Sequence, residues 1–160
     1  MNRQILLLVV LMSLTCSPVF AQEAVKGVAN AEALFKASNP RLNTNKQAAL
    51  HIMKDLLQCN HWDEAGKWLT ARYLQHNPTV ASGRDNVVRF FGSRPKAPVC
   101  EQLMTPVVAV LAEGDLVTVV IAREYKESKD PSKTYTSTWF DMWRFVDGKA
   151  DEHWDAATKP

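Results

Sequence analysis

The chain has 160 residues, of which 46% are apolar and 22% are charged, and its formal net charge is +2. This length and composition are typical of one globular domain with a sizeable core. A net charge so close to zero gives no reason to expect a nucleic acid or an acidic membrane surface as a partner. We therefore expect a single domain that binds neither.

Residues 1–21 have the pattern of a cleavable signal peptide. Arg3 supplies the initial positive charge, residues 5–14 are apolar, and Val19 and Ala21 stand at the −3 and −1 positions of a cleavage site. The apolar stretch is shorter than the roughly 20 residues that span a bilayer. We expect a secreted or periplasmic protein that starts at Gln22 and has no stable membrane insertion after cleavage.

Three cysteines leave two alternatives open. Cys16 follows the apolar stretch, as the lipidated cysteine of a lipoprotein does, although Thr15 and Ser13 fit a lipidation motif poorly. Cys59 and Cys100 remain after cleavage, and an oxidising compartment allows them to form a disulfide. Two buried thiols are the other interpretation.

The first part of the mature chain leads into a helix. Residues 22–43 are rich in alanine and are predicted to form a tether or a short helix. A helix is predicted over residues 44–58, because Thr44 and Gln47 make a capping box and apolar residues recur at helical spacing after it. We expect the folded domain to cover residues 44–157.

Two shorter helices are expected next. Apolar residues at helical spacing predict one over residues 62–71. The segment 73–78 should bend, since Pro78 disfavours helical geometry at the residue before it. A third helix is expected over residues 85–91.

After residue 98 the pattern changes to strands. Four segments are rich in β-branched and aromatic residues: 103–112, 116–125, 134–145 and 149–156. The first two are joined by Glu-Gly-Asp, which is typical of a hairpin. Helices followed by a run of hairpin strands predict the α+β class, with the N-terminal helices packed on one face of a curved antiparallel sheet.

The turn of the last hairpin decides which side chains share a sheet face. A three-residue turn at 146–148, closed by its glycine, places Asp141 opposite His153 and Trp139 opposite Asp155. All four then lie on one face, because alternate residues of a strand point the same way. A two-residue Asp-Gly turn is the alternative, and it would put Asp141 and His153 on opposite faces.

Two carboxylates and an imidazole on an aromatic floor have a chemical use. A carboxylate in a partly dry pocket can take a proton from a carbon beside a carbonyl group. A neighbouring histidine or acid can donate a hydrogen bond to the enolate oxygen that develops. The alternative is a structural ion pair between Asp141 and His153 on a solvated sheet face.

Four short motifs occur in order: Tyr-Leu-Gln-His-Asn-Pro at 73–78, Ala-Glu-Gly-Asp-Leu-Val at 112–117, Phe-Asp-Met-Trp-Arg-Phe at 140–145, and Asp-Gly-Lys followed by Glu-His-Trp-Asp within 147–155. In order and spacing the chain resembles the SnoaL-like polyketide cyclase family, in the branch predicted to catalyse aldol condensation or ester cyclisation. The resemblance covers about residues 45–155, which is most of the mature chain.

The resemblance implies a fold and a chemistry. The fold is the nuclear-transport-factor-2-like (NTF2-like) cone, with a pocket between the curved sheet and the helices. Well-known members close polyketide rings without metal or cofactor, using an acidic residue as acid and base. Carried onto this chain, Asp155 is the expected general base, Asp141 and His153 orient or polarise the substrate, and His76 lies near the pocket mouth. The expected substrate-binding residues are Trp139, Trp143, Tyr73 and Asn77.

The expected partner is a small hydrophobic carbonyl compound, and the expected activity is that of a cofactor-independent lyase or isomerase. Many relatives carry a histidine in the strand after the Gly-Asp-Leu-Val turn, but residues 118–123 contain none. A non-catalytic periplasmic binding module with the same pocket is therefore the alternative. Arg123 is either a surface cation or a group that binds a substrate carboxylate. Phe140 and Trp154, on the sheet face away from the site, predict a homodimer.

Overall fold

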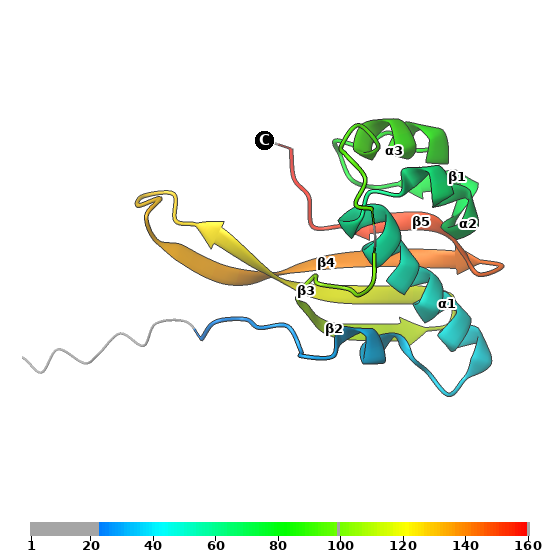
Figure 1. Ribbon diagram of the computed structural model, residues 1–160, viewed down its shortest axis with the longest axis horizontal. Helices are drawn as coiled ribbons and strands as arrows, with labels where there is room; N and C mark the ends of the chain where they lie inside the picture. The colour runs from blue at the N-terminus through cyan, green and yellow to red at the C-terminus, as the bar shows by residue number, and fades with distance from the viewer. Residues whose placement is uncertain (1–22, 99, 160) are drawn as a thin grey trace, which may run out of the picture.

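The computed structural model describes residues 23–98 and 100–159. Five strands form one curved sheet in the order β1-β5-β4-β3-β2, and the helices cover one of its faces (Figure 1). The α+β class is confirmed. The predicted signal peptide, with Cys16, lies outside the described residues. Within these residues, no helix is both long enough and apolar enough to cross a membrane.

In the described residues the helical elements all lie before β2, and β1 lies between α2 and α3. These helical elements are η1 (Ala31–Phe35), α1 (Pro40–His51), η2 (Ile52–Gln58), η3 (Trp62–Glu64), α2 (Ala65–Trp68) and α3 (Arg84–Phe91). The strands are β1 (Leu69–Gln75), β2 (Val107–Glu113), β3 (Leu116–Lys126), β4 (Thr134–Val146) and β5 (Lys149–Asp155). Four of the five strands match the predicted segments, and β1 is the one that the sequence did not indicate.

Helix α1 begins at Pro40 and not at Thr44. The Asn39 side chain accepts a hydrogen bond from the Leu42 N–H at 3.2 Å, and proline at the first helical position loses no hydrogen bond because that N–H has no partner in any helix. The Thr44 hydroxyl donates to the Pro40 carbonyl instead, at 3.0 Å. The predicted capping box is therefore wrong, and the Asn-Pro pair supplies the cap.

The segment before α1 belongs to the domain. Residues 31–35 form the short 3-10 helix η1, and Phe35 is completely buried in the core. Further upstream, the Val28 N–H donates to the Val107 carbonyl at 2.8 Å, so the chain runs beside β2. This segment thus contains a short helix and contacts the sheet.

The predicted helix over residues 62–71 ends at Trp68. Residues 69–75 form β1, which pairs in parallel with β5, so the sheet is mixed. Leu69 and Tyr73 are its buried residues, and their spacing of four is also that of a helix, which explains the helical prediction. The segment forms a strand and not a helix because the edge of β5 offers backbone hydrogen bonds to an extended chain.

The turn of the last hairpin is the two-residue form. Val146 pairs with Lys149, and Asp147 and Gly148 between them have φ of 50° and 74°. Positive φ at both central residues is typical of a type I′ turn, which Asp-Gly favours. The prediction of a three-residue turn is wrong, and this turn by itself would separate Asp141 from His153.

A β-bulge reverses that effect. Phe145 pairs with Ala150 but Arg144 pairs with Glu152, so Asp151 is an extra residue in β5. Beyond the bulge the register has shifted by one more residue, and Asp141 lies opposite Asp155. The predicted direct pairing of Asp141 with His153 is wrong, but the two side chains do share a face and meet diagonally.

Contacts from β1 hold the bulge. The Thr70 hydroxyl donates to the Asp151 carboxylate at 2.7 Å, and Arg72 forms an ion pair with it. The Arg72 guanidinium holds the pKa of Asp151 below its usual value, and the bond from Thr70 adds to this effect. The bulge is thereby tied to the neighbouring strand.

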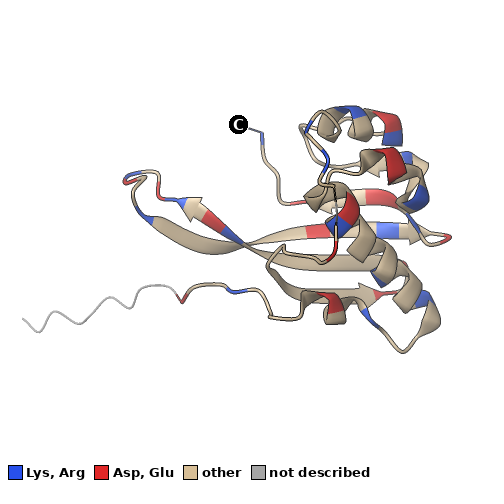
Figure 2. Cartoon of the chain, viewed as in Figure 1, with Lys and Arg blue, Asp and Glu red and all other residues tan. Residues whose placement is uncertain are grey.

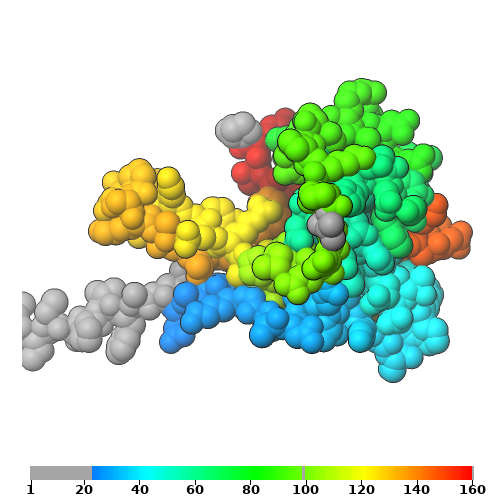
Figure 3. All heavy atoms as spheres, viewed as in Figure 1, coloured from blue at the N-terminus to red at the C-terminus, as the bar shows by residue number. Residues whose placement is uncertain are grey.

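The core lies between the helices and the concave face of the sheet. Its fully buried large side chains come from η1, η2, α3 and strands β1 to β4, and include Phe35, Ile52, Leu56, Leu69, Val87, Val107, Val117, Val119 and Trp143. The far part of the β3–β4 hairpin projects beyond this body as an arm (Figures 1 and 3). Positive and negative side chains are interspersed over the elements instead of gathering on one of them (Figure 2).

Cys59 and Cys100 form a disulfide, with Cα atoms 6.0 Å apart. It joins the end of η2 to the long connection between α3 and β2. That connection includes Arg94, Thr105 and Pro106, which help to wall the cavity described below. The disulfide therefore fixes one side of the cavity.

Removing the disulfide should lower stability by about 2–4 kcal/mol, because the bond closes a chain segment 41 residues long. We expect dithiothreitol, or the double change of Cys59 and Cys100 to serine, to lower the melting temperature measured by circular dichroism. Reductant should have no further effect on the double variant. An unchanged melting temperature of the reduced wild type would contradict a stabilising role.

Candidate functional site

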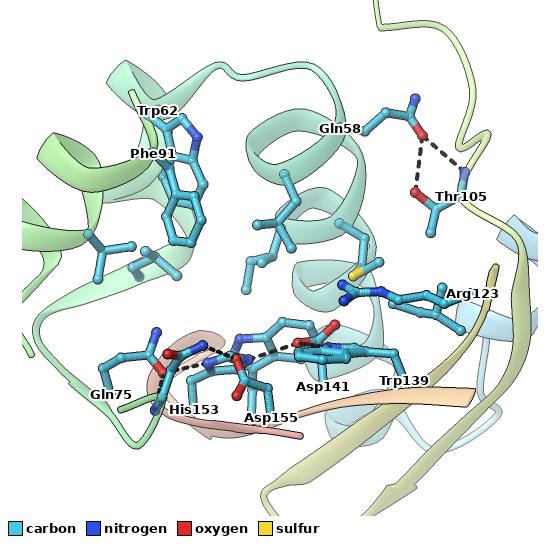
Figure 4. A pocket seen from close by; sticks show the side chains of 18 of the residues that line it. Gln58, Trp62, Gln75, Phe91, Thr105, Arg123, Trp139, Asp141, His153 and Asp155 are labelled. Atoms are coloured by element: carbon cyan, nitrogen blue, oxygen red, sulfur yellow. Dashed lines mark hydrogen bonds and ion pairs between the residues drawn. The ribbon is translucent and has the colours of Figure 1, made fainter. Parts of the chain in front are cut away.

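A cavity of about 480 Å³ lies between η2, the short helices and the concave face of the sheet. Its walls are mostly apolar and aromatic, as is usual for a site that takes a small molecule. The widened turns of the π-helix η2 supply Ile52, Met53, Leu57 and Gln58. The strands supply a floor on which the polar groups gather (Figure 4).

Asp141 and His153 form a pair on this floor. His153 Nε2 lies 3.1 Å from Asp141 Oδ1, and each residue is only 7% exposed. The Trp139 indole N–H donates to the same carboxylate oxygen at 3.2 Å. The Trp143 ring lies beneath the imidazole, with ring centres 5.2 Å apart. The hydrogen bond to Asp141 and the stacking on Trp143 together fix the position of the imidazole ring.

Gln75, from β1, fixes the proton on the other imidazole nitrogen. Its Oε1 accepts a hydrogen bond from the Asn77 backbone N–H at 3.2 Å, which identifies that atom as the oxygen. The same oxygen lies 2.7 Å from His153 Nδ1, so Nδ1 must carry a hydrogen and donate it. The contact between Nε2 and Asp141 then holds one proton, on either the imidazole or the carboxyl group.

Asp155 lies directly across from Asp141 and is also hydrogen-bonded. The Asn77 side-chain amide donates to Asp155 Oδ2 at 2.6 Å, and the Ala157 backbone N–H donates to Oδ1 at 2.9 Å. Each oxygen keeps a second lone pair, since a carboxylate oxygen accepts two hydrogen bonds. Asp155 is oriented and still able to accept a proton.

Tyr73 is buried beside this cluster and remains a neutral phenol. Burial raises the pKa of Tyr73 far above its usual value, and the Asp141 and Asp155 carboxylates add to the effect against a smaller lowering by Trp143. The Trp143 indole N–H donates to the Tyr73 oxygen at 3.0 Å. The tyrosine O–H is thereby left to serve as a hydrogen-bond donor.

Asp141, His153 and Asp155 are also chemically suited to hold a metal ion. Each offers one ligand atom, and these atoms lie within 4.8 Å of one another. Oxygen and imidazole nitrogen ligands suit divalent ions such as Zn²⁺ and Mn²⁺. The same residues are hydrogen-bonded in this arrangement, and their side chains are also suited to acid–base chemistry. The prediction that no metal is used stays a prediction.

The structure brings together seven of the eight residues that the sequence singled out. Asp155, Asp141, His153, Trp139, Trp143, Tyr73 and Asn77 all line the cavity. His76 does not, because strand alternation turns it away from its neighbours Gln75 and Asn77. Its imidazole contacts the Glu152 carboxylate at 2.8 Å and stacks on Trp154, with ring centres 5.0 Å apart.

Sequence reasoning missed polar residues of the cavity wall, among them Gln75, Thr105 and Gln58. Gln75 was passed over because its segment was interpreted as a bend, whereas strand alternation would have placed it with Tyr73 and Asn77. Thr105 and Gln58 carried no signal. Trp62 and Phe91 stack with ring centres 5.1 Å apart and line the cavity as well as the core.

The model of the SnoaL-like domain family matches residues 53–153, which is more than half of the chain and includes Asp141 and His153 but ends before Asp155. No functionally curated protein matches the chain at a significant level. The comparisons with solved structures therefore carry the remaining information about the fold.

Three similar structures have TM-scores just above 0.5. A putative SnoaL-like polyketide cyclase from Jannaschia is 17% identical, with a TM-score of 0.52, and the match covers 76% of this chain and 91% of that one. An NTF2-like protein of unknown function from Burkholderia pseudomallei is 16% identical with a TM-score of 0.51 (72% and 91% covered). A protein with a cystatin-like fold from Xanthomonas campestris has the same identity, TM-score and coverage.

At these identities the structural matches establish the fold and leave the activity open. They agree with the mixed curved sheet and the helices on its concave face. Taken with the matched domain model, they show that the chain belongs to the SnoaL-like domain family and has the NTF2-like fold.

Proposed function

We propose that the protein is an exported, cofactor-independent lyase or isomerase that moves a proton at a carbon beside a carbonyl group of a small hydrophobic molecule. The observation that carries this proposal is the Asp141–His153–Asp155 cluster on the floor of a largely apolar cavity. A base, a proton donor and an apolar enclosure are what such a reaction needs. The Jannaschia neighbour is itself named a putative SnoaL-like polyketide cyclase.

In the proposed reaction Asp155 takes the proton from carbon. The bond from Asn77 to one carboxylate oxygen and the bond from Ala157 to the other hold the group in place. As the C–H bond breaks, its electron pair forms the enolate double bond, and the carbonyl oxygen gains negative charge. The protonated Asp155 then returns the proton to carbon, at the same or another position. In an aldol reaction the enolate carbon instead attacks a second carbonyl carbon, the electron pair of that C=O π bond moves to its oxygen, and the oxygen takes the proton from Asp155.

The Asp141–His153 pair supplies the proton donor. Because Gln75 keeps Nδ1 protonated, the single proton between His153 Nε2 and Asp141 is the one available to the enolate oxygen. The Tyr73 hydroxyl is a second donor beside it. Donors that are fixed before the reaction stabilise the developing charge without reorganising. His76 takes no part, since its contacts are with Glu152 and Trp154.

A binding module without turnover is the second candidate, and one position favours it. Val119 lies opposite Asp141 in β3, on the strand where many relatives carry a histidine. An apolar side chain there supplies no further acid or base. The two candidates make different predictions for proton exchange, and one experiment separates them.

Asp155→Asn should abolish chemistry while leaving binding nearly intact. The amide keeps the shape and one of the two hydrogen bonds, because only its oxygen can accept, and it cannot take the proton. We therefore expect a loss of about 10²-fold or more in rate. The rate is measured by NMR as hydrogen–deuterium exchange in D₂O at the α-carbon of ketones that carry an aromatic ring, such as phenylacetone. Affinity for the same ketones is measured by calorimetry.

Asp147→Asn is the matched control. It removes a carboxylate from the same hairpin, and asparagine tolerates the φ of 50° at that position. Exchange should be unchanged in this variant and in the wild type treated with EDTA. Binding without exchange in the wild type would favour the binding module, and exchange that is lost with EDTA and restored by Zn²⁺ would contradict a metal-free reaction.

Export is proposed from the N-terminal pattern and is supported by the disulfide, since disulfides persist mainly in oxidising compartments. We expect the mature protein to begin at Gln22. Intact-mass measurement of protein from a periplasmic extract should give the mass of residues 22–160 less two hydrogens for the disulfide. The mass of the full chain, or of a lipid on Cys16, would contradict it.

We also propose that the convex sheet face forms a homodimer. Phe140, in β4, is 45% exposed on this face, and the partly exposed Trp154, in β5, lies on the same face. Light scattering at micromolar concentration should give twice the monomer mass, and Phe140→Arg should give the monomer. Phe90→Arg is the control, because Phe90 is 53% exposed on α3 and away from that face. A wild-type monomer would contradict the proposal.

A further inference from the structure

One end of the cavity is polar and carries a positive charge. Arg123 lies there with Thr105 and Gln58, while Trp62 and Phe91 form the opposite, apolar end (Figure 4). The Asp141–His153–Asp155 cluster occupies the floor between the two ends. A ligand that spans the cavity therefore meets three chemically different regions in sequence.

The Arg123 guanidinium is held flat on an aromatic ring. Its Cζ lies 3.8 Å from the centre of the Trp139 ring, and the Trp139 N–H is in turn bonded to Asp141. Stacking fixes the plane of a guanidinium and leaves its N–H groups pointing outward from its edges. Those edges match the two oxygens of a carboxylate.

Arg123 has no carboxylate partner in the described part of the chain. The arginine ion pairs there are made by Arg72, Arg84 and Arg144. Arg123 comes from β3 and lines the cavity in the company of a second arginine, Arg94. A guanidinium that is positioned but unpaired is suited to bind a charged group of a ligand.

The charge of the lining favours an anion in spite of the two aspartates. The Asp141–His153 pair is neutral overall, because the proton it shares offsets the carboxylate. The remaining charged lining residues are Asp155, Arg94 and Arg123, so one negative charge stands against two positive charges. The lining therefore has a net charge of +1, which an anionic ligand would neutralise.

We propose that the ligand is an amphipathic carboxylic acid, with its apolar end between Trp62 and Phe91 and its carboxylate on Arg123. This inference names the substrate class of the proposed function and rests on it for one point, that the reacting carbonyl group lies over the Asp141–His153 pair. Arg123 is then a specificity-determining residue. The rival interpretation, a surface cation that only stacks on Trp139, predicts no effect on ligand choice.

A matched pair of dyes tests the anion site. 8-Anilinonaphthalene-1-sulfonate and N-phenyl-1-naphthylamine share their aromatic body, and only the first carries an anionic group. We expect Arg123→Gln to lower the affinity for the sulfonate dye by roughly tenfold to a hundredfold, as for a lost charge-assisted hydrogen bond. The affinity for the neutral dye should fall by less than about twofold. Fluorescence titration measures both, and 4-phenylbutanoate should displace the sulfonate dye far better than its methyl ester.

Arg89→Gln is the control for net charge, because Arg89 lies on α3 and outside this cavity. This variant should bind both dyes with unchanged affinity, and melting curves should show that both variants fold. Equal losses for the two dyes in Arg123→Gln, or no loss of the sulfonate dye, would overturn the proposal. The dye titrations do not depend on turnover. If the dyes show an anion preference that depends on Arg123 but no α-proton exchange is detected, the anion site is supported and only the proposed reaction is contradicted.

Discussion

The site depends on a single extra residue in β5. A two-residue Asp-Gly turn joins β4 to β5, and without correction it would send the Asp141 and His153 side chains to opposite faces of the sheet. The bulge at Asp151 inserts one residue and returns both to the concave face. Its cost is a local loss of ladder hydrogen bonds, which the contacts of Asp151 with Thr70 and Arg72 offset. A bulge beside a functional cluster that re-aims its side chains is a common use of this feature.

Strand β1 then completes what the bulge begins. Its parallel pairing with β5 brings Gln75 beside His153 and places Asn77, just beyond its end, beside Asp155. A backbone N–H fixes the orientation of the Gln75 amide, and that amide fixes the tautomer of the imidazole. The state of one proton on the cavity floor is thus set by the geometry of an edge strand. This edge strand links the fold directly to the proposed acid–base chemistry.

The NTF2-like fold hosts many functions, so the function of this protein has to be argued from the contents of its cavity. The neutral Asp141–His153 pair, the oriented Asp155 and the stacked Arg123 divide the cavity into a reactive floor and a cationic end. The Cys59–Cys100 disulfide secures the connection that closes this cavity on one side. Together these features support the proposed site for a small amphipathic molecule and the proposed proton transfer on the cavity floor.

The sequence by itself determined the α+β class, four of the five strands, the family and seven candidate residues that the structure places around the cavity. It did so because alternation, hairpin composition and ordered motifs are local properties of the chain. Only the tertiary structure decided the rest. The bulge at Asp151, the strand at residues 69–75 and the contact of Gln75 with His153 all depend on pairing between segments far apart in sequence. Leu69 and Tyr73 have a spacing that suits a helix as well as this irregular strand, and hydrogen bonding to the edge of β5 selected the strand. His76 looked equivalent to its neighbours in the motif, and the alternation of that strand turned it outward onto Trp154.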